Sequence, residues 1–166
     1  ADRPPLTGLH AVGRHADPLR QVIHHFKYDG WHTLASPLGA LLVPILADAP
    51  RPTCVIAVPS HPLRLSERGY DHAELLARQV AAHLHVPLDT RTMFRIRATA
   101  HQVRQTTAVE RRTNVAGAFL AQPVPPGTTV LLVDDVYTSG STMQECARAL
   151  LQAGADTVWG ACLSRA

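Results

Sequence analysis

Val-Leu-Leu-Val-Asp-Asp-Val-Tyr-Thr-Ser-Gly-Ser-Thr, residues 130–142, is the stretch that decides the fold. Four apolar residues, typical of a buried strand, end at two adjacent carboxylates. A short loop of small and hydroxylated residues follows, and a helix is expected to begin at about Ser141. Carboxylates can hold a polyol or a cation, and a loop that opens a helix can hold a phosphate. A ligand with all of these features is a phosphorylated sugar with a metal ion.

Apolar periodicity predicts the other elements around this stretch. We expect helices at about 17–29, 34–43, 71–84 and 141–153, strands at 53–58, 93–96, 129–134 and 157–163, and a weak strand at 86–88. Alternation of helices with all-apolar strands predicts an α/β fold with a parallel, helix-covered sheet. Without a repeat or a linker, residues 1–166 are expected to form one domain. The polar stretch 97–116 is expected to be a flexible lid.

Composition permits a globular domain with a real core, because 46% of the 166 residues are hydrophobic. A net charge of +3 and a pI of about 9.1 would suit phosphate-bearing partners. Only Lys27 is a lysine, however, so the basicity equally fits a bias towards arginine in the coding sequence. With 5% aromatic residues, no basic-aromatic stripe for stacking single-stranded bases is expected. The apolar runs are too short to span a membrane.

The cysteines and histidines limit the redox and metal chemistry that the sequence allows. The three cysteines, Cys54, Cys146 and Cys162, are far apart and form no Cys-x-x-Cys pair. They indicate reduced core thiols in a cytoplasmic protein. The pairs His24-His25 and His83-x-His85 have no third ligand at a useful spacing, so no zinc site is expected.

The two carboxylates and the loop are the candidate site. Ligands of parallel sheets bind at the carboxyl ends of strands, and neighbouring strand residues point to opposite faces, so Asp134 and Asp135 can bracket a ligand. Alternatively, one acid caps the next turn and the other pairs with an arginine. In the loop, Gly140 permits close backbone approach to a phosphate, and Ser141 or Thr142 is expected to cap the helix with Glu145 completing a capping box.

Other enzyme classes lack their sequence motifs here. The chain contains no Gly-x-x-x-x-Gly-Lys-Ser/Thr loop, which disfavours a nucleotide triphosphatase. It also contains no Gly-x-Ser-x-Gly and no Gly-x-Gly-x-x-Gly run, so nothing supports a hydrolase or a methyltransferase.

Residues 133–142 resemble the phosphoribosyl diphosphate (PRPP) signature of type I phosphoribosyltransferases. Three further blocks resemble the ComF/GntX-like branch of that family, which contains competence-associated proteins of bacteria. They are residues 26–30, residues 58–71 with Arg64 and Arg68, and Gln102 with residues 110–119. The similarity runs over about residues 19–164. It implies the type I phosphoribosyltransferase fold, a central parallel sheet flanked by helices, with a small hood from the N-terminal part and the 97–116 region.

The resemblance also implies roles for matching residues. Asp134 and Asp135 would hold the ribose hydroxyls of PRPP, directly or through water bound to Mg²⁺. The remaining implied contacts are Tyr137, Thr138, Ser139, Gly140, Ser141 and Thr142 for the 5-phosphate; Pro59, Ser60, His61, Arg64 and Arg68 for the diphosphate; and Gln102, Arg104, Arg111 and Asn114 in the lid.

Several of these residues have plainer interpretations. Arg64 and Arg68 also fit a solvated basic face, His61 a turn without ligand, and the lid residues a plain polar loop. For Lys27 two interpretations stay open, a side chain that faces the site and a helix-end lysine near the helix dipole, and the second is favoured.

For function, the resemblance implies Mg²⁺-dependent PRPP binding with phosphoribosyl transfer to an unknown acceptor, in the setting of DNA uptake. Thr138 stands where purine-salvage relatives carry an acid that handles the base, which disfavours a 6-oxopurine acceptor. The zinc-binding cysteine module found upstream in many ComF-like proteins does not occur in this sequence. The alternative is a non-catalytic PRPP-sensing protein that binds single-stranded DNA or a competence partner through arginines. Relatives of this fold often form homodimers, but no sequence feature identifies an interface.

Overall fold

A computed structural model of the chain describes residues 4–60, 65–66, 69–97 and 115–166. Its main sheet has four strands in the order β1-β6-β5-β2, and all neighbours are parallel. These strands are β1 (Gly8–Arg14), β2 (Cys54–Ala57), β5 (Thr129–Tyr137) and β6 (Thr157–Arg165). A separate antiparallel pair consists of β3 (Met93–Arg95) and β4 (Phe119–Ala121). The predicted α/β fold with a parallel sheet is confirmed.

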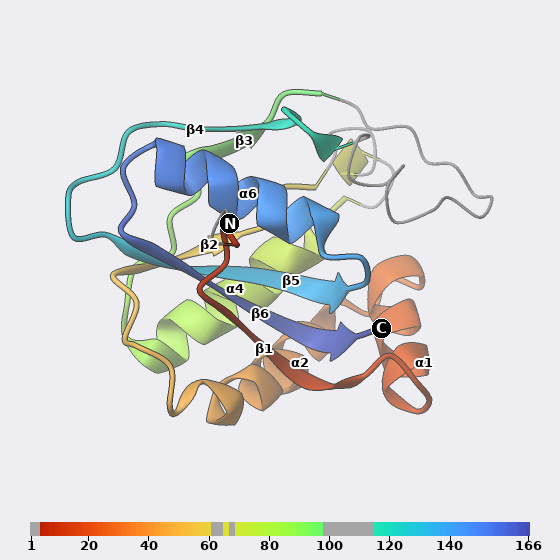
Figure 1. Cartoon of the computed structure of the whole chain (residues 1–166). Coiled ribbons are helices and arrows are strands. Elements are labelled where there is room, and N and C mark those ends of the chain that lie inside the picture. The colour runs from red at the N-terminus through yellow and green to blue at the C-terminus, as the bar shows by residue number, and fades with distance from the viewer. Residues whose placement is uncertain (1–3, 61–64, 67–68, 98–114) are drawn as a thin grey trace.

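Helices cover both faces of the main sheet (Figure 1). One face carries α1 (Leu19–Tyr28), α2 (Ala35–Leu42) and α4 (His72–Leu84), with short 3₁₀ turns η1 (His32–Leu34) and η2 (Pro44–Leu46) beside them. The other face carries α6 (Ser141–Gln152), over which the β3–β4 pair lies. None of the helices in the described part of the chain combines the length and the apolarity that a membrane crossing needs.

The alternation of side chains along β5 divides the interior into two cores. Leu131 and Val133 pack with α1, α2 and α4, whereas Val130 and Leu132 pack with α6. Because strand residues alternate between faces, the next odd-numbered residue, Asp135, turns towards α1 and α4, and Asp134 turns towards α6. The fold thus separates the two adjacent carboxylates onto opposite faces of one strand.

Several strands differ from the sequence expectation, which did not include β4 (Phe119–Ala121) and ended β6 at residue 163 instead of Arg165. Strand β1 was not expected, because its mixed composition shows no clear period; it pairs with β6 and places the N-terminal part in the main sheet. Strand β5 continues past residue 134 to Tyr137 because β6 runs beside it as far as Arg165. Residues 86–88 form no strand. They make a single bridge between Val55 and Leu88, since Pro87 has no N–H to donate to a ladder.

The three cysteines are free thiols, as expected. Cys146 and Cys162 are fully buried, and Cys54 is half-buried. Burial raises the pKa of all three thiols, that of Cys162 to about 12.

Candidate functional site

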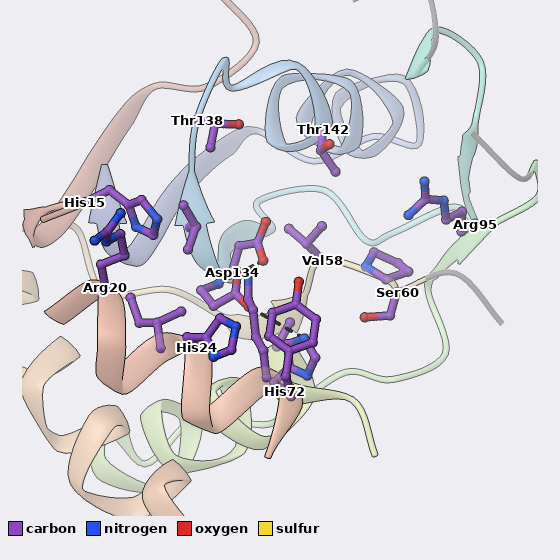
Figure 2. A pocket seen from close by; sticks show the side chains of 17 residues that line it. His15, Arg20, His24, Val58, Ser60, His72, Arg95, Asp134, Thr138 and Thr142 are labelled. Carbon is purple, nitrogen blue, oxygen red and sulfur yellow. Dashed lines mark hydrogen bonds and ion pairs between the residues drawn. The ribbon is translucent and has the colours of Figure 1, made fainter. Parts of the chain in front are cut away.

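A cavity of about 580 Å³ opens at the carboxyl ends of β2 and β5, beside α1 (Figure 2). In the view of Figure 2, His15, Arg20 and His24 lie on one side and Ser60 and Arg95 on the other. The full lining is His15, Arg20, Ile23, His24, Lys27, Tyr28, Val58, Pro59, Ser60, His72, Ala73, Arg95, Asp134, Asp135, Val136, Thr138 and Thr142. Position and lining agree with the rule that ligands of parallel sheets bind beyond the strand ends.

The two carboxylates reach this cavity in different states. Asp135 is 4% exposed, and its Oδ2 lies 2.9 Å from Lys27 Nζ and 3.7 Å from His72 Nε2. Asp134 is half-buried, and its Oδ1 accepts a hydrogen bond of 2.8 Å from the backbone N–H of Asp135. Asp135 therefore already has a cationic partner, while Asp134 has none among the described ion pairs.

Lys27 lies in the last turn of α1, as expected, and it also belongs to the site, which was the less favoured of the two interpretations. The last turn of α1 lies over the end of β5, and the long side chain of Lys27 reaches inward to Asp135. The sequence analysis also considered that one of the two acids pairs with an arginine. In the structure Asp135 pairs with a lysine instead. The sequence feature that pointed to this role is that Lys27 is the one lysine among the 16 Lys and Arg residues of the chain.

Burial and charge make Asp134 electrostatically unusual. Burial, followed by the charge of Asp135, raises the pKa of the Asp134 carboxyl well above its ordinary value of 3.8. The charge of Lys27 acts in the opposite direction. An ionised Asp134 is therefore costly unless a cation comes close, and hard divalent cations prefer such carboxylate oxygens. The residues present fit a magnesium ion on the Asp134 side of the cavity.

The loop after β5 is shaped by Gly140, which has a φ of 73°. A Cβ at this position would overlap the ring and hydroxyl of Tyr137, so the tight turn requires glycine. Thr138 and Thr142 line the large cavity, and residues 137–142 surround a smaller one of about 40 Å³. The loop residues thus line both cavities at the start of α6.

The expected capping box at α6 is absent. Gly140 is the N-cap and makes no side-chain capping bond, and the hydroxyls of Ser139 and Ser141 bond to each other. Glu145 instead accepts the backbone N–H of Gly117 and pairs with Arg148. The backbone N–H of Ser141 makes a long bond of 3.5 Å to Ser139 Oγ, and the N-cap Gly140 offers no side chain to the other N–H groups of the first turn, which suits an anion site.

The turn after β2 supplies another part of the cavity wall. Pro59 and Ser60 line it, and the backbone N–H of Ser60 donates to Asp71 Oδ2 at 3.2 Å. The other oxygen of Asp71 caps α4 by accepting from Ala73 and Glu74. One side chain thus ties the turn to the start of α4.

Seven residues that were predicted to contact PRPP or to form the lid are not among the residues that the structure describes. They are His61, Arg64, Arg68, Gln102, Arg104, Arg111 and Asn114. Conversely, sequence reasoning did not find five polar lining residues: His15, Arg20, His24, His72 and Arg95. They come from separate elements and show no common spacing, so only the fold brings them together.

For His24 and His25, but not for His83 and His85, the described residues supply a third candidate ligand that the sequence analysis did not expect. His24, His25 and Asp29 place their ligand atoms within 4.8 Å of one another at the end of α1. The spacing was visible in the sequence, since positions four apart on a helix share a face.

The sequence of this chain is similar to those of known proteins. Residues 71–165 match the family described as phosphoribosyl transferase domain. A DNA utilization protein YhgH of Escherichia coli O157:H7 is 36% identical over 168 residues, covering 98% of this chain and 74% of that protein. Competence protein F of Haemophilus influenzae is 34% identical, covering 90% of this chain and 69% of that protein.

A solved structure supports the same fold. Glutamine PRPP amidotransferase from Bacillus subtilis, complexed with ADP and GMP, superposes with a TM-score of 0.54 at 23% identity. The match covers 79% of this chain and 26% of that one. Family match, relatives and topology agree: the chain belongs to the phosphoribosyl transferase domain family, in its ComF-like branch, and has the type I fold.

Proposed function

We propose that this protein binds PRPP with Mg²⁺ and transfers its phosphoribosyl group to an acceptor. The observation that carries the proposal is the convergence of Asp134, Asp135, Thr138 and Thr142 on one cavity, at the start of a helix without a side-chain cap. Carboxylates suit the ribose hydroxyls, and the loop with the helix N-terminus suits the 5-phosphate.

The residues of the cavity match the demands of the reaction. Departure of diphosphate from C1 develops positive charge on the sugar ring, as in glycoside cleavage. Asp134 places a carboxylate near the sugar, Asp135 paired with Lys27 adds hydrogen-bond acceptors, and Arg95 adds positive charge to the same cavity wall. Such fixed charges lower the barrier most when water is excluded. Residues 59–68 are proposed to meet the diphosphate and residues 97–116 to close over it.

Magnesium is the proposed cofactor. Bound on the Asp134 side, it would neutralise charge on the departing diphosphate. Asp134 suits this position because its carboxylate is half-buried without a cationic partner among the described ion pairs. Asp135, held by Lys27, is proposed to accept hydrogen bonds from the ribose instead.

The proposed biological setting is DNA uptake and use. It rests on the relatives named DNA utilization protein and competence protein. A cytoplasmic location is part of the proposal, supported by the free thiols. The proposal also includes an acceptor of the phosphoribosyl group and a homodimeric state.

Thermal unfolding tests the binding step. Ligand at 100 times its Kd stabilises by about 2.7 kcal/mol, and a domain of this size gains about 2–4 °C in Tm per kcal/mol. We expect such a shift with PRPP and Mg²⁺, and none in Asp134→Asn/Asp135→Asn. Diphosphate release with candidate bases or ammonia then tests turnover. An unshifted Tm at millimolar PRPP would refute the proposal.

A second candidate is a non-catalytic protein that binds single-stranded DNA. Beside the cavity, Tyr28 is 56% and Trp31 52% exposed, and His25 stacks on Trp31. Exposed rings near basic groups can stack unpaired bases, so the low aromatic content does not exclude a small platform. A Trp31→Ala change that weakens DNA binding at several salt concentrations, in a protein that never releases diphosphate, would favour this function.

A further inference from the structure

The end of α1 brings three metal-ligating side chains together outside the PRPP contacts. His25 Nδ1 lies 2.5 Å from Asp29 Oδ2, and His24 Nδ1 lies 4.0 Å from the same oxygen. All three ligand atoms fall within 4.8 Å of one another. An ordinary ion pair four residues apart on a helix accounts for His25 and Asp29. It does not account for the approach of His24 to the same carboxylate oxygen.

The donor set selects a class of ion. Two imidazole nitrogens and one carboxylate oxygen suit zinc and neighbouring transition metals, whereas Mg²⁺ prefers oxygen ligands alone. The cluster also sits at the C-terminal end of α1, where the helix dipole favours a cation. Three protein ligands would leave one tetrahedral position open.

Neighbouring aromatic rings pack against both imidazoles. Trp31 stacks on His25 with 4.8 Å between ring centroids and 18° between the planes. The ring centroids of Tyr28 and His24 are 4.9 Å apart. These contacts limit the ring rotation that metal binding would otherwise have to restrict. Because the side chains of His24 and Asp29 are 63% and 43% exposed, an ion can enter directly from solvent.

We propose that His24, His25 and Asp29 bind one divalent transition metal ion of the zinc class at the rim of the cavity. His24 and Tyr28 line that cavity, so the ion would fix the His24 ring in its wall and add positive charge beside Lys27. The site is separate from the proposed magnesium position, and its existence does not depend on phosphoribosyl transfer.

Calorimetric titration with ZnCl₂, without PRPP and Mg²⁺, tests the site. We expect one ion per chain. Loss of even an outer partner weakens metal sites about tenfold or more, so His24→Ala, His25→Ala and Asp29→Asn should each weaken binding at least that much. The matched control is His83→Ala/His85→Ala, which removes two exposed imidazoles at the end of α4 and should leave zinc binding unchanged.

Tryptophan fluorescence gives a second readout. Ni²⁺ bound beside the His25–Trp31 stack should quench emission, and Trp31→Phe should remove the quenching while Ni²⁺ still binds by calorimetry. Unliganded melting curves of all variants check that they fold. The proposal is overturned if zinc gives no heat, if the three ligand variants bind like the parent, or if the His83/His85 control loses binding equally.

Discussion

At the scale of single residues, the adjacent acids Asp134 and Asp135 have different chemistry because β5 turns them to opposite faces. Asp135 is neutralised by Lys27, while Asp134 faces the cavity beside the loop that opens α6. One carboxylate is thus paired within the protein, and the other has no cationic partner among the described ion pairs. The two positions are expected to respond differently to substitution.

Asp134→Asn should raise stability at neutral pH while abolishing PRPP binding. The folded state holds the proton of Asp134 above pH 3.8, where the unfolded chain releases it, because the pKa is raised by burial and by Asp135. This group therefore costs stability increasingly as pH rises from 3.8 towards its raised pKa. Melting curves from pH 4 to 8 should show that the Tm of the variant, relative to that of the parent, increases as pH rises. The exposed Asp48→Asn should show no such gain.

Lys27→Met should destabilise the protein by about 3 kcal/mol, because it leaves the buried Asp135 carboxylate without its partner. Lys27→Met/Asp135→Asn removes both charges and should recover most of that loss. Urea unfolding of the two single variants and the double variant measures the coupling. A loss in the double variant equal to the sum of the losses in the two single variants would show that the ion pair does not contribute.

At the scale of elements, the β5–α6 connection depends on its backbone as much as on its hydroxyls. Gly140 permits a left-handed turn in which the Tyr137 ring occupies the space of a side chain. Arg165 at the end of β6 lies with its guanidinium carbon 6.0 Å from the centre of that ring. The strand end, the turn and the helix start therefore form one packed unit.

Gly140→Ala should weaken PRPP binding about tenfold or more, which corresponds to about 1.4 kcal/mol of lost binding energy. The added methyl must displace Tyr137 and with it the loop of residues 137–142. Gly127→Ala is the matched control, since Gly127 has a φ of 81° but open space around its Cβ position. Both changes carry about 1–2 kcal/mol of backbone strain. Calorimetry should find the affinity loss in Gly140→Ala alone.

At the scale of the whole molecule, two cores pack on the two faces of the sheet and enclose the thiols of α6 and β6. Cys146 and Cys162 are inaccessible in the folded state, and their raised pKa values keep them protonated at neutral pH. Since the thiolate is the reactive form, these residues report on opening of the fold.

Alkylation of the native protein with iodoacetamide at neutral pH should leave Cys146 and Cys162 unmodified over the time in which an unfolded chain reacts completely. Cys54, which is only half-buried, should react slowly. Mass spectrometry of native and guanidinium-treated samples measures all three positions. Rapid native labelling of Cys162 would contradict the burial described for β6.

Local patterns were sufficient for much of the fold and for part of the site. The apolar runs of β2, β5 and β6 and the periodic helices predicted a parallel α/β sheet because burial on both faces demands such sequences. They did not predict β1, whose pairing depends on β6 as a neighbour. Residues 86–88 were predicted as a strand but form only one bridge, between Val55 and Leu88.

By itself, the sequence determined that two acids precede a glycine-containing loop and a helix, because strand period, turn chemistry and helix start are encoded within a few residues. Only the tertiary structure decided that Lys27 neutralises Asp135 and that His72 and Arg95 line the same cavity. These contacts join residues from separate elements. Their distances depend on how helices pack on the sheet, and no local period records that packing.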